Sequence, residues 1–169
     1  FSFSNTGVMF ENHIYSTKSF PKIVKSKTLN QIIVKTNIGS EYFISDSKEE
    51  KFAYLKGSKS IPRTNKATGI QYNYSEGKMT FPDDLELPGR TMLTSEGSVN
   101  RSTHVIKDYE TSKLRLITPI EAERLNEFPD NWTDTGMTKS KRYFMMGNAL
   151  VTGVVKKLGK EISNIIENE

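Results

Sequence analysis

Apolar residues recur at helical spacing in the last third of the chain, and they predict two helices there. The first is expected to begin at Thr118, because Thr is a good N-cap, Pro119 suits the first helical position and Glu121 completes a capping box. Pro129 is expected to end this helix. The apolar face of the helix carries Ala122, Leu125 and Phe128.

The second helix is expected after Gly147-Asn148-Ala149 and should run to about residue 166. Its apolar stripe comprises Leu150, Val151, Val154, Val155, Leu158, Ile162 and Ile165. Such a stripe needs a surface to cover, and by itself it is typical of ordinary core packing. Between the two helices we expect a polar loop that Trp132 anchors by packing, followed by a short segment that Ser140 caps.

The first two thirds of the chain have the pattern of β and irregular structure. Residues 31–35 and 41–44 are β-prone runs separated by turn-forming residues, and we expect them to pair as a hairpin. A helix is expected next, with Asp46 as its N-cap and Gly57 as its C-terminal glycine. Residues 71–75 alternate aromatic and polar side chains, as a half-exposed strand does.

Basic residues recur among Tyr and Phe in these two thirds, and the formal net charge is +4. Such a surface suits a polyanion, although a mixed solvated surface produces the same pattern. The stretch from Lys56 to Lys66 is basic, rich in hydroxyl groups and poor in apolar residues. It predicts a flexible loop, either simply solvated or in contact with phosphates.

The composition excludes several classes of protein. The chain contains no cysteine, which rules out disulfides and thiolate metal sites, and His13 and His104 are too far apart in sequence to suggest a zinc site. No apolar run approaches the length of a membrane-spanning helix and no signal peptide is evident, so we expect a soluble cytoplasmic protein without a membrane partner. Because the chain begins with Phe1 rather than Met, we expect a processed, cut or expressed fragment.

Two motifs near the C-terminus together resemble those of DNA (cytosine-5) methyltransferases. The ninth motif of that family is matched by Arg115, Thr118, Pro119, Glu121, Arg124, Leu125, Phe128, Pro129 and Asp130. The tenth motif is matched by Gly147, Asn148, Ala149 and Val154. Because both motifs occur in the family's order and at about its spacing, the chain resembles the C-terminal part of that family.

The resemblance implies roles for particular residues. In the family, the arginine of the ninth motif helps to fix the recognition region against the catalytic body. We carry that role to Arg115, with Glu121 and Arg124 as structural partners and Thr118 as a further residue of the structural motif. A Glu and an Arg three residues apart on a helix can also form an ordinary surface pair. The Asn-containing turn of the family helps to close the pocket for S-adenosyl-L-methionine, which implies that this cofactor lies near Asn148, Ala149 and Leu150.

Residues 88–106 resemble the core of the family's target-recognition region, where a Thr-containing strand and a Gly-bearing loop enter the major groove of DNA. Arginine can bridge guanine O6 and N7, and hydroxyl groups can serve either type of base. Without the neighbouring motifs, the same residues would suggest a β-hairpin with a polar loop. The expected DNA-binding residues are Lys59, Arg63, Arg90, Thr91, Thr94, Ser95, Arg101 and His104.

The family's catalytic motifs are missing from the chain. It has no F-x-G-x-G nucleotide loop, no Pro-Cys pair, no Glu-Asn-Val and no Gln-x-Arg-x-Arg. Methyl transfer in this family proceeds by attack of a cysteine thiolate on the base, and this chain has no thiol. We therefore expect the chain alone to be inactive, and an N-terminal catalytic half or subunit to supply the thiolate, the glutamate and most of the cofactor site.

The expected fold class is α+β. Residues 1–114 would form a small, mostly β target-recognition domain on double-stranded DNA. Residues 115–169 would carry the helices that complete an α/β S-adenosylmethionine-dependent methyltransferase domain. The expected function is sequence recognition and cofactor-pocket completion for a DNA (cytosine-5-)-methyltransferase of a bacterial or phage-borne restriction–modification system. A non-enzymatic DNA-binding module or decayed methyltransferase remnant is the first alternative, and an unrelated α+β interaction protein is the second.

Overall fold

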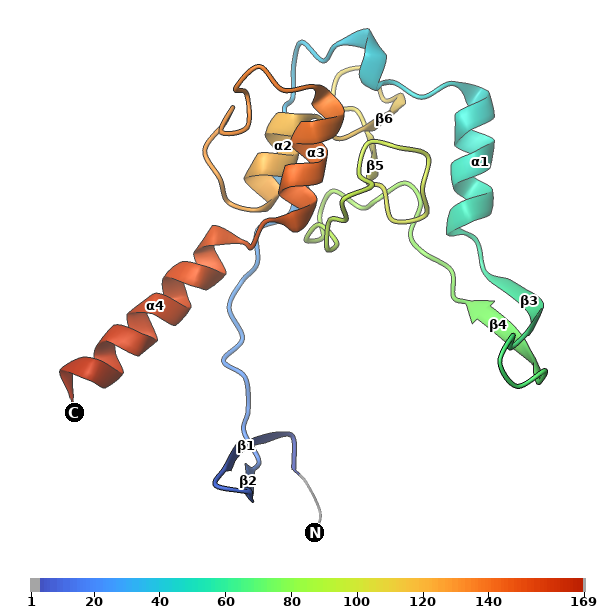
Figure 1. Ribbon diagram of the computed structural model, residues 1–169. Helices are drawn as coiled ribbons and strands as arrows, with labels where there is room; N and C mark the ends of the chain where they lie inside the picture. Colours follow the sequence, from blue (N-terminus) through green and yellow to red (C-terminus); the bar gives the residue numbers. More distant parts are fainter. Residues whose placement is uncertain (1–3, 169) are drawn as a thin grey trace.

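The computed structural model describes residues 4–168 and shows a mixture of short β-hairpins and helices (Figure 1). The strands are β1 (Thr6–Phe10), β2 (His13–Thr17), β3 (Lys59–Thr64), β4 (Gln71–Glu76), β5 (Val105–Lys107) and β6 (Leu114–Leu116). The helices are η1 (Leu29–Gln31), η2 (Ser40–Tyr42), α1 (Asp46–Lys56), α2 (Pro119–Leu125), α3 (Lys139–Asn148) and α4 (Thr152–Glu167), where η marks a 3-10 helix. The described strands pair only as the antiparallel hairpins β1–β2, β3–β4 and β5–β6.

A hydrophobic core joins distant parts of the chain. Its buried members are Leu29, Ile32, Ile33, Met92, Ile106, Ile117, Ala122, Tyr143 and Met146. Burial of apolar surface, worth about 25 cal/mol per Å², is the main favourable term in such a fold. The core contains residues from both sides of position 114, so the first part of the chain and the C-terminal helices share it.

Helix α2 begins as the sequence predicts. The Thr118 hydroxyl accepts a hydrogen bond from the Glu121 backbone N–H at 3.2 Å, and the Glu121 carboxylate accepts one from the Thr118 N–H at 2.6 Å. The capping box is therefore confirmed. The helix ends at Leu125, earlier than Pro129 suggests, and Glu127 adopts a left-handed φ of 59° that turns the chain away.

Two details of the following loop and helix differ from expectation. The N-cap of α3 is Thr138, whose hydroxyl accepts from the Lys141 N–H, so Ser140 is not the cap. Trp132 is 60% exposed and lies obliquely on Phe128, with ring centroids 6.0 Å apart, which is a weaker anchor than the buried packing expected. Helix α4 is confirmed.

The hairpin expected from residues 31–35 and 41–44 is wrong. These residues contain the end of η1 and most of η2, while Phe43 forms an isolated β-bridge with Arg115 instead. Ile32 and Ile33, the most β-prone residues of the run, are buried in the shared core. Contacts with distant parts of the chain override the local β preference here.

Helix α1 is confirmed, with Ser45 rather than Asp46 at its N-cap and Gly57 at its C-cap. The flexible loop expected after it is wrong. Residues 59–64 form strand β3, which pairs antiparallel with β4. The strand predicted at residues 71–75 is therefore confirmed, and it has a partner that the basic composition of residues 56–66 concealed.

The N-terminal hairpin β1–β2 has a two-residue turn, Glu11-Asn12, in which both residues have positive φ values of 47° and 61°. A turn of this kind matches the twist of the flanking strands, and Asn tolerates it well. This hairpin was not predicted from the sequence. Its strands expose Val8, Met9, Phe10, Ile14 and Tyr15.

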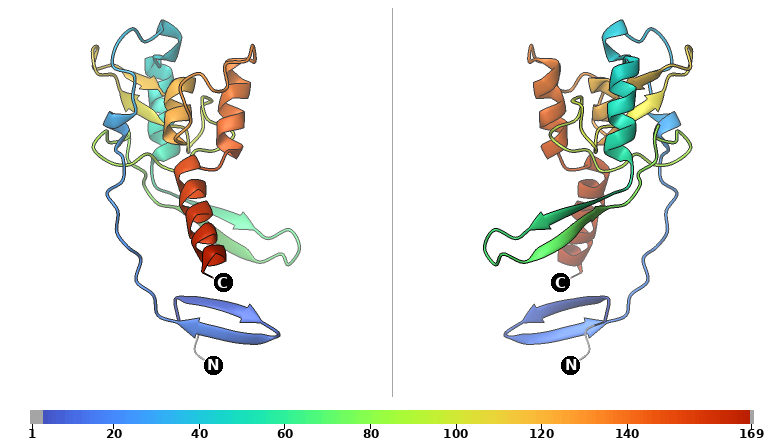
Figure 2. Two further views of the ribbon diagram at one scale, coloured as in Figure 1. Left: turned by 90° about the vertical axis from the view of Figure 1, so that its left-hand side faces the viewer. Right: turned by 90° about the vertical axis from the view of Figure 1, so that its right-hand side faces the viewer.

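Three elements project from the core, as Figures 1 and 2 show. The hairpin β1–β2 lies at the far end of an extended segment, residues 18–28, that leads to η1. The hairpin β3–β4 extends beyond the end of α1, and α4 leaves the core in another direction (Figure 1). No helix in the described part of the chain is long and apolar enough to cross a membrane.

Candidate nucleic-acid interface

The centre of the structure is a buried charge cluster around Arg115, which is 0% exposed. The Arg115 guanidinium donates to both carboxylate oxygens of Glu121 at 2.8 Å and to Asp108 at 3.0 Å. It also donates to the backbone carbonyl of Val34 at 3.1 Å. The structure thus brings Arg115, Glu121 and Thr118 together, and they connect α2 to two distant segments.

The charges in this Arg115 cluster (Arg115, Asp108 and Glu121) support one another. Burial acts to raise the pKa of the Asp108 carboxyl, but hydrogen bonds from Thr111 and Arg115 hold that pKa below its ordinary value. Burial also opposes the charge on Arg115, yet the Glu121 and Asp108 carboxylates raise the pKa of the guanidinium. Asp108 and Arg115 therefore keep their charges while excluded from water.

Arg124 lies nearby but belongs to a different pair. Its guanidinium holds the Asp130 carboxylate through two hydrogen bonds of 2.7 and 2.6 Å, and it donates to the Ile32 carbonyl at 3.0 Å. Sequence reasoning missed Glu123, which is fully buried and accepts hydrogen bonds from Thr133 and Arg142. This carboxylate fastens the polar loop and α3 to α2. Its position one residue before the motif arginine carried no distinguishing signal.

The expected recognition segment, residues 88–106, contains turns, and only its last two residues, Val105 and Ile106, lie in a strand, β5. Thr91 and Thr94 are exposed and Ser95 is half-buried, so these three residues can reach a ligand. Arg90 is engaged within the protein: its guanidinium grips the Asp83 carboxylate at 2.8 and 3.1 Å and donates to the Ser102 carbonyl. The structure therefore does not favour contact between Arg90 and guanine, because the donors of the Arg90 guanidinium already have partners in the protein.

Arg101 and His104 also differ from the expectation. Arg101 donates to the backbone carbonyls of Leu55, Gly57 and Gly77, so it joins the end of α1 to the end of β4. His104 is 0% exposed and faces inward, with its Nδ1 3.0 Å from the Glu96 carboxylate. These residue types suit DNA contact, but the fold uses both to hold the recognition segment in place.

The Asp83 carboxylate contacts several residues that attach this segment to the rest of the protein. Besides Arg90, its carboxylate accepts from the Val105 N–H and lies 3.9 Å from the Lys56 ammonium, which itself donates to the Thr103 carbonyl. Burial lowers the pKa of Lys56 to about 8, although the charge of Asp83 acts in the opposite direction. The recognition segment is thus attached to α1 through buried polar contacts.

Helix α3 packs directly on the same segment. A Cβ on Gly147 would collide with the backbone of Leu93 and Thr94, and a Cβ on Gly97 would collide with the Tyr143 ring. Gly97 also has a φ of +80°, which favours glycine. The tenth-motif glycine is therefore needed for close approach to the loop that carries Thr94.

Asn148, Ala149 and Leu150 follow that glycine and join α3 to α4. The Asn148 amide donates to the Phe144 carbonyl at 2.9 Å, and Leu150 is 74% exposed. A groove of about 460 Å³ runs beside them, and its lining includes Met92, Leu125, Ala149, Val151, Val154 and Leu158. The structure brings the expected cofactor-binding turn to the mouth of a mainly apolar groove.

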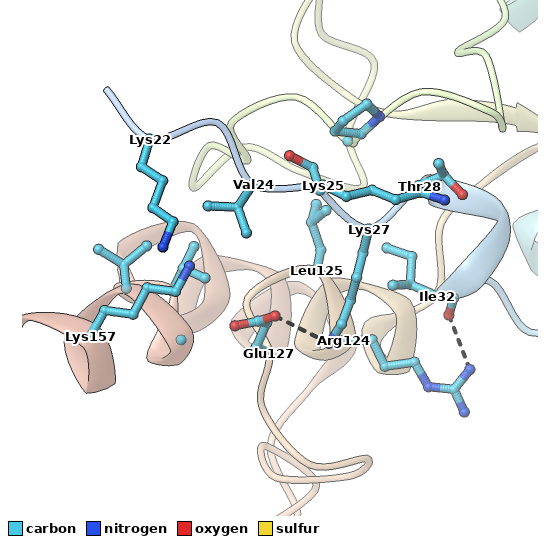
Figure 3. A pocket seen from close by; sticks show the side chains of 16 residues that line it. Lys22, Val24, Lys25, Lys27, Thr28, Ile32, Arg124, Leu125, Glu127 and Lys157 are labelled. Carbon is cyan, nitrogen blue, oxygen red and sulfur yellow. Dashed lines mark hydrogen bonds and ion pairs between the residues drawn. The ribbon is translucent and has the colours of Figure 1, made fainter. Parts of the chain in front are cut away.

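A second, basic hollow of about 590 Å³ lies between the extended segment and the start of α4 (Figure 3). Four lysines contribute to its lining, Lys22, Lys25, Lys27 and Lys157. Lys27 is paired with Glu127 at 3.1 Å, and Arg124 reaches across to the Ile32 carbonyl. Sequence reasoning missed this site, because the lysines gather only when residues 22–27 pass over α2 and α4.

Comparison with known proteins adds to this geometry. A family model described as C-5 cytosine-specific DNA methylase matches residues 4–164. The type II methyltransferase M.Sau3AI of Staphylococcus aureus is 48% identical over 165 residues, which is 98% of this chain and 39% of that protein. The chain thus spans about two fifths of the length of this curated relative.

Two solved structures share the fold at low sequence identity. The S. pombe Dnmt2 methyltransferase superposes with a TM-score of 0.60 at 14% identity, over 85% of this chain and 44% of that one. The Entamoeba histolytica methyltransferase EhMeth gives a TM-score of 0.54 at 18% identity, over 94% of this chain and 46% of that one. With the family model matching nearly all of its residues, the chain belongs to the C-5 cytosine-specific DNA methylase family.

Proposed function

We propose that this chain is the target-recognition region and C-terminal part of a DNA (cytosine-5-)-methyltransferase from a restriction–modification system. In this proposal it binds duplex DNA, selects the target site and completes the cofactor pocket. An N-terminal catalytic half, as a subunit or as the rest of the same protein, supplies the thiolate. We place the boundary between DNA recognition and completion of the cofactor pocket at residue 114, although the residues on both sides share one core.

The observation that carries the proposal is the exposed apolar face of α4. Val154, Leu158, Ile162 and Ile165 are each more than half exposed in a helix of 16 residues. A contiguous apolar surface of this kind marks an interaction site. The strands of β1–β2 expose further apolar residues, so two projecting elements present surfaces that a catalytic half can cover.

The recognition segment supports contact with DNA. Thr91, Thr94 and Ser95 stand at the surface, while Arg90 and His104 hold the segment from behind. Exposed hydroxyl groups can donate to or accept from base edges. Enzymes that modify a base in duplex DNA must first take it out of the duplex. Because internal contacts of Arg90 and His104 hold the segment in place, it would stabilise duplex DNA from which the target base has been extruded.

S-adenosyl-L-methionine supplies the methyl group in this family, and the residues present fit one side of its site. Ala149 and Leu150 line the apolar groove, where they would hold the cofactor from one wall, and Asn148 precedes them in the turn. The polar groups that its amino-acid portion needs would come from the catalytic half. This chain's own task is to shape the groove and exclude water from it.

The test is methyl transfer to DNA cytosine, measured with this chain alone and after mixing. The second component is a polypeptide with the catalytic motifs, taken from the part of the staphylococcal relative that this chain does not match. We expect no transfer by either component and site-specific transfer by the mixture. A matched mixture with Leu158→Asp should lose transfer, because the charge would prevent α4 from being covered.

Other outcomes would redirect the proposal. Transfer by this chain alone would overturn it, since the chain has no cysteine. Salt-dependent DNA binding with no transfer in the mixture would favour a non-enzymatic DNA-binding module. If the mixture shows neither methyl transfer nor DNA binding, an unrelated α+β interaction protein would be favoured.

A further inference from the structure

We propose that the projecting hairpin β3–β4 enters the major groove of DNA and reads base edges with one of its two faces. The inference rests on the proposed function, because it assigns a specific part of the DNA contact to residues outside the 88–106 segment. The reading face, defined here as the uncharged face, comprises Ser60, Pro62, Thr64, Gln71, Asn73 and Ser75.

The register of the hairpin separates its side chains by chemistry. Residues on opposite strands that pair directly lie on the same face, and successive residues alternate between faces. One face holds the pairs Lys59–Glu76, Ile61–Tyr74 and Arg63–Tyr72. The other holds Ser60–Ser75, Pro62–Asn73 and Thr64–Gln71, which are short, uncharged and, apart from the proline, able to form hydrogen bonds.

The charged face is partly occupied by its own contacts. The Lys59 ammonium lies 3.4 Å from the Glu76 carboxylate and 4.7 Å from the Tyr54 ring, and Arg63 stacks on Tyr74 at 3.9 Å. These contacts leave Lys59 a poor candidate for the phosphate contact expected of it. All six residues of the uncharged face are exposed.

Hydrogen bonds hold the base of the hairpin, where β3 begins and β4 ends. The core therefore sets the direction in which the hairpin projects. Arg101 bridges the carbonyl groups before β3 and after β4 and pairs with Glu76 at 3.3 Å. The Met79 N–H donates to the Lys56 carbonyl on the other side of the root. An isolated two-stranded hairpin is only marginally stable in water, but this one is held at its base and free along its length (Figure 2).

Duplex DNA is the occupant that fits this arrangement. The major groove admits a two-stranded β-ribbon, and amide side chains pair with adenine N6 and N7 there. From Gly57 to Lys78 the hairpin carries four cations and one carboxylate, and Lys66 lies in its exposed tip. A cationic ribbon with an uncharged amide and hydroxyl face suits a polyanion whose inner edges are hydrogen-bonding groups.

The experiment measures binding by the assembled methyltransferase to its target site and to single-base variants of that site, over a range of salt concentrations. Asn73→Val and Gln71→Val remove the amide and introduce a β-branched side chain that suits a strand. We expect each to reduce the preference for the target site roughly ten- to hundredfold. Lys66→Ala should instead weaken binding to all sequences alike and lower the salt slope by about 0.9.

Two variants of α4 serve as matched controls, Asn164→Ala and Lys160→Ala, because this helix projects far from the hairpin (Figure 1). Both should leave sequence preference and salt slope unchanged. If wild-type enzyme discriminates between sites and the two Val variants discriminate equally well, the inference is wrong while the proposed function stands. If the Val variants instead fail to assemble with the catalytic half, the hairpin docks on protein and the inference is again wrong. If wild-type assembled enzyme does not bind DNA, the proposed function fails first.

Discussion

The Arg115 cluster and helix α4 differ in where their side chains find partners. In the cluster, every charged group is buried and its hydrogen-bonding partner lies within the chain. In α4, the apolar face is turned to solvent and no residue of the helix is buried. The first region finds its partners within the chain, whereas the described residues leave the apolar face of the second uncovered.

This difference teaches where stability and function lie in the chain. A buried ion pair is strongly destabilised when one partner is removed, because the other charge remains without water or a counter-ion. An exposed apolar side chain contributes little until a partner covers it. Substitutions in the core should therefore change folding, and substitutions in the projecting elements should change assembly or DNA binding.

The largest effect is expected for Arg115→Met. It would leave the Glu121 and Asp108 carboxylates buried together, and we expect the free energy of unfolding to fall by about 3–5 kcal/mol. Urea denaturation monitored by circular dichroism measures this loss. The control is Arg124→Met, whose ion pair with Asp130 is 33% and 45% exposed at its two side chains, and it should cost no more than about 1 kcal/mol. Equal losses would show that burial does not distinguish the two pairs.

A smaller effect is expected for Gly147→Ala. The added methyl group would push against the backbone of Leu93 and Thr94, and overpacking of this kind costs about 1–3 kcal/mol. Gly159→Ala in α4 is the matched control, since nothing lies within 4 Å of its Cβ position. That change should stabilise the chain by about 0.5–1 kcal/mol, because Ala is the better helix former. The same sign for both variants in thermal unfolding would contradict the packing of α3 on the recognition segment.

The smallest effect on folding is expected for Leu158→Ala. Its side chain is 59% exposed, so the free energy of unfolding of this chain alone should change by less than about 0.5 kcal/mol. Ile117→Ala, at a residue that is 1% exposed, should cost about 2–5 kcal/mol in the same urea titration. A large loss for Leu158→Ala would mean that α4 is covered by this chain in solution.

Local signals in the sequence predicted the helices well. The capping box at Thr118 and Glu121, the glycine after α1 and the apolar stripe of α4 each act within a few residues, so their consequences can be read along the chain. The expected hairpin of residues 31–35 and 41–44 failed because Ile32 and Ile33 are buried in a core that includes residues more than seventy positions away, such as Ile117. The pattern of apolar and polar residues along the chain does not show which distant residues will pack together in the core.

The structure separates the expected DNA-binding residues into exposed and engaged side chains. Thr91 and Thr94 are exposed as a reading surface requires, but Arg90, Arg101 and His104 are engaged inside the protein. Arginine binds a carboxylate or a backbone carbonyl by the same donor geometry with which it binds a base. The residue type alone therefore does not reveal which partner the fold presents.

By itself the sequence determined the family resemblance, the capping box that begins α2, the glycine that follows α1, and the absence of cysteine. The tertiary structure decided which cations point inward, how α3 meets the recognition segment, and that β3–β4 separates charged from uncharged side chains. The physical reason is the range of the interactions. Caps and turns are formed by neighbours in the chain, whereas ion pairs, close packing and strand register depend on residues that only folding brings together.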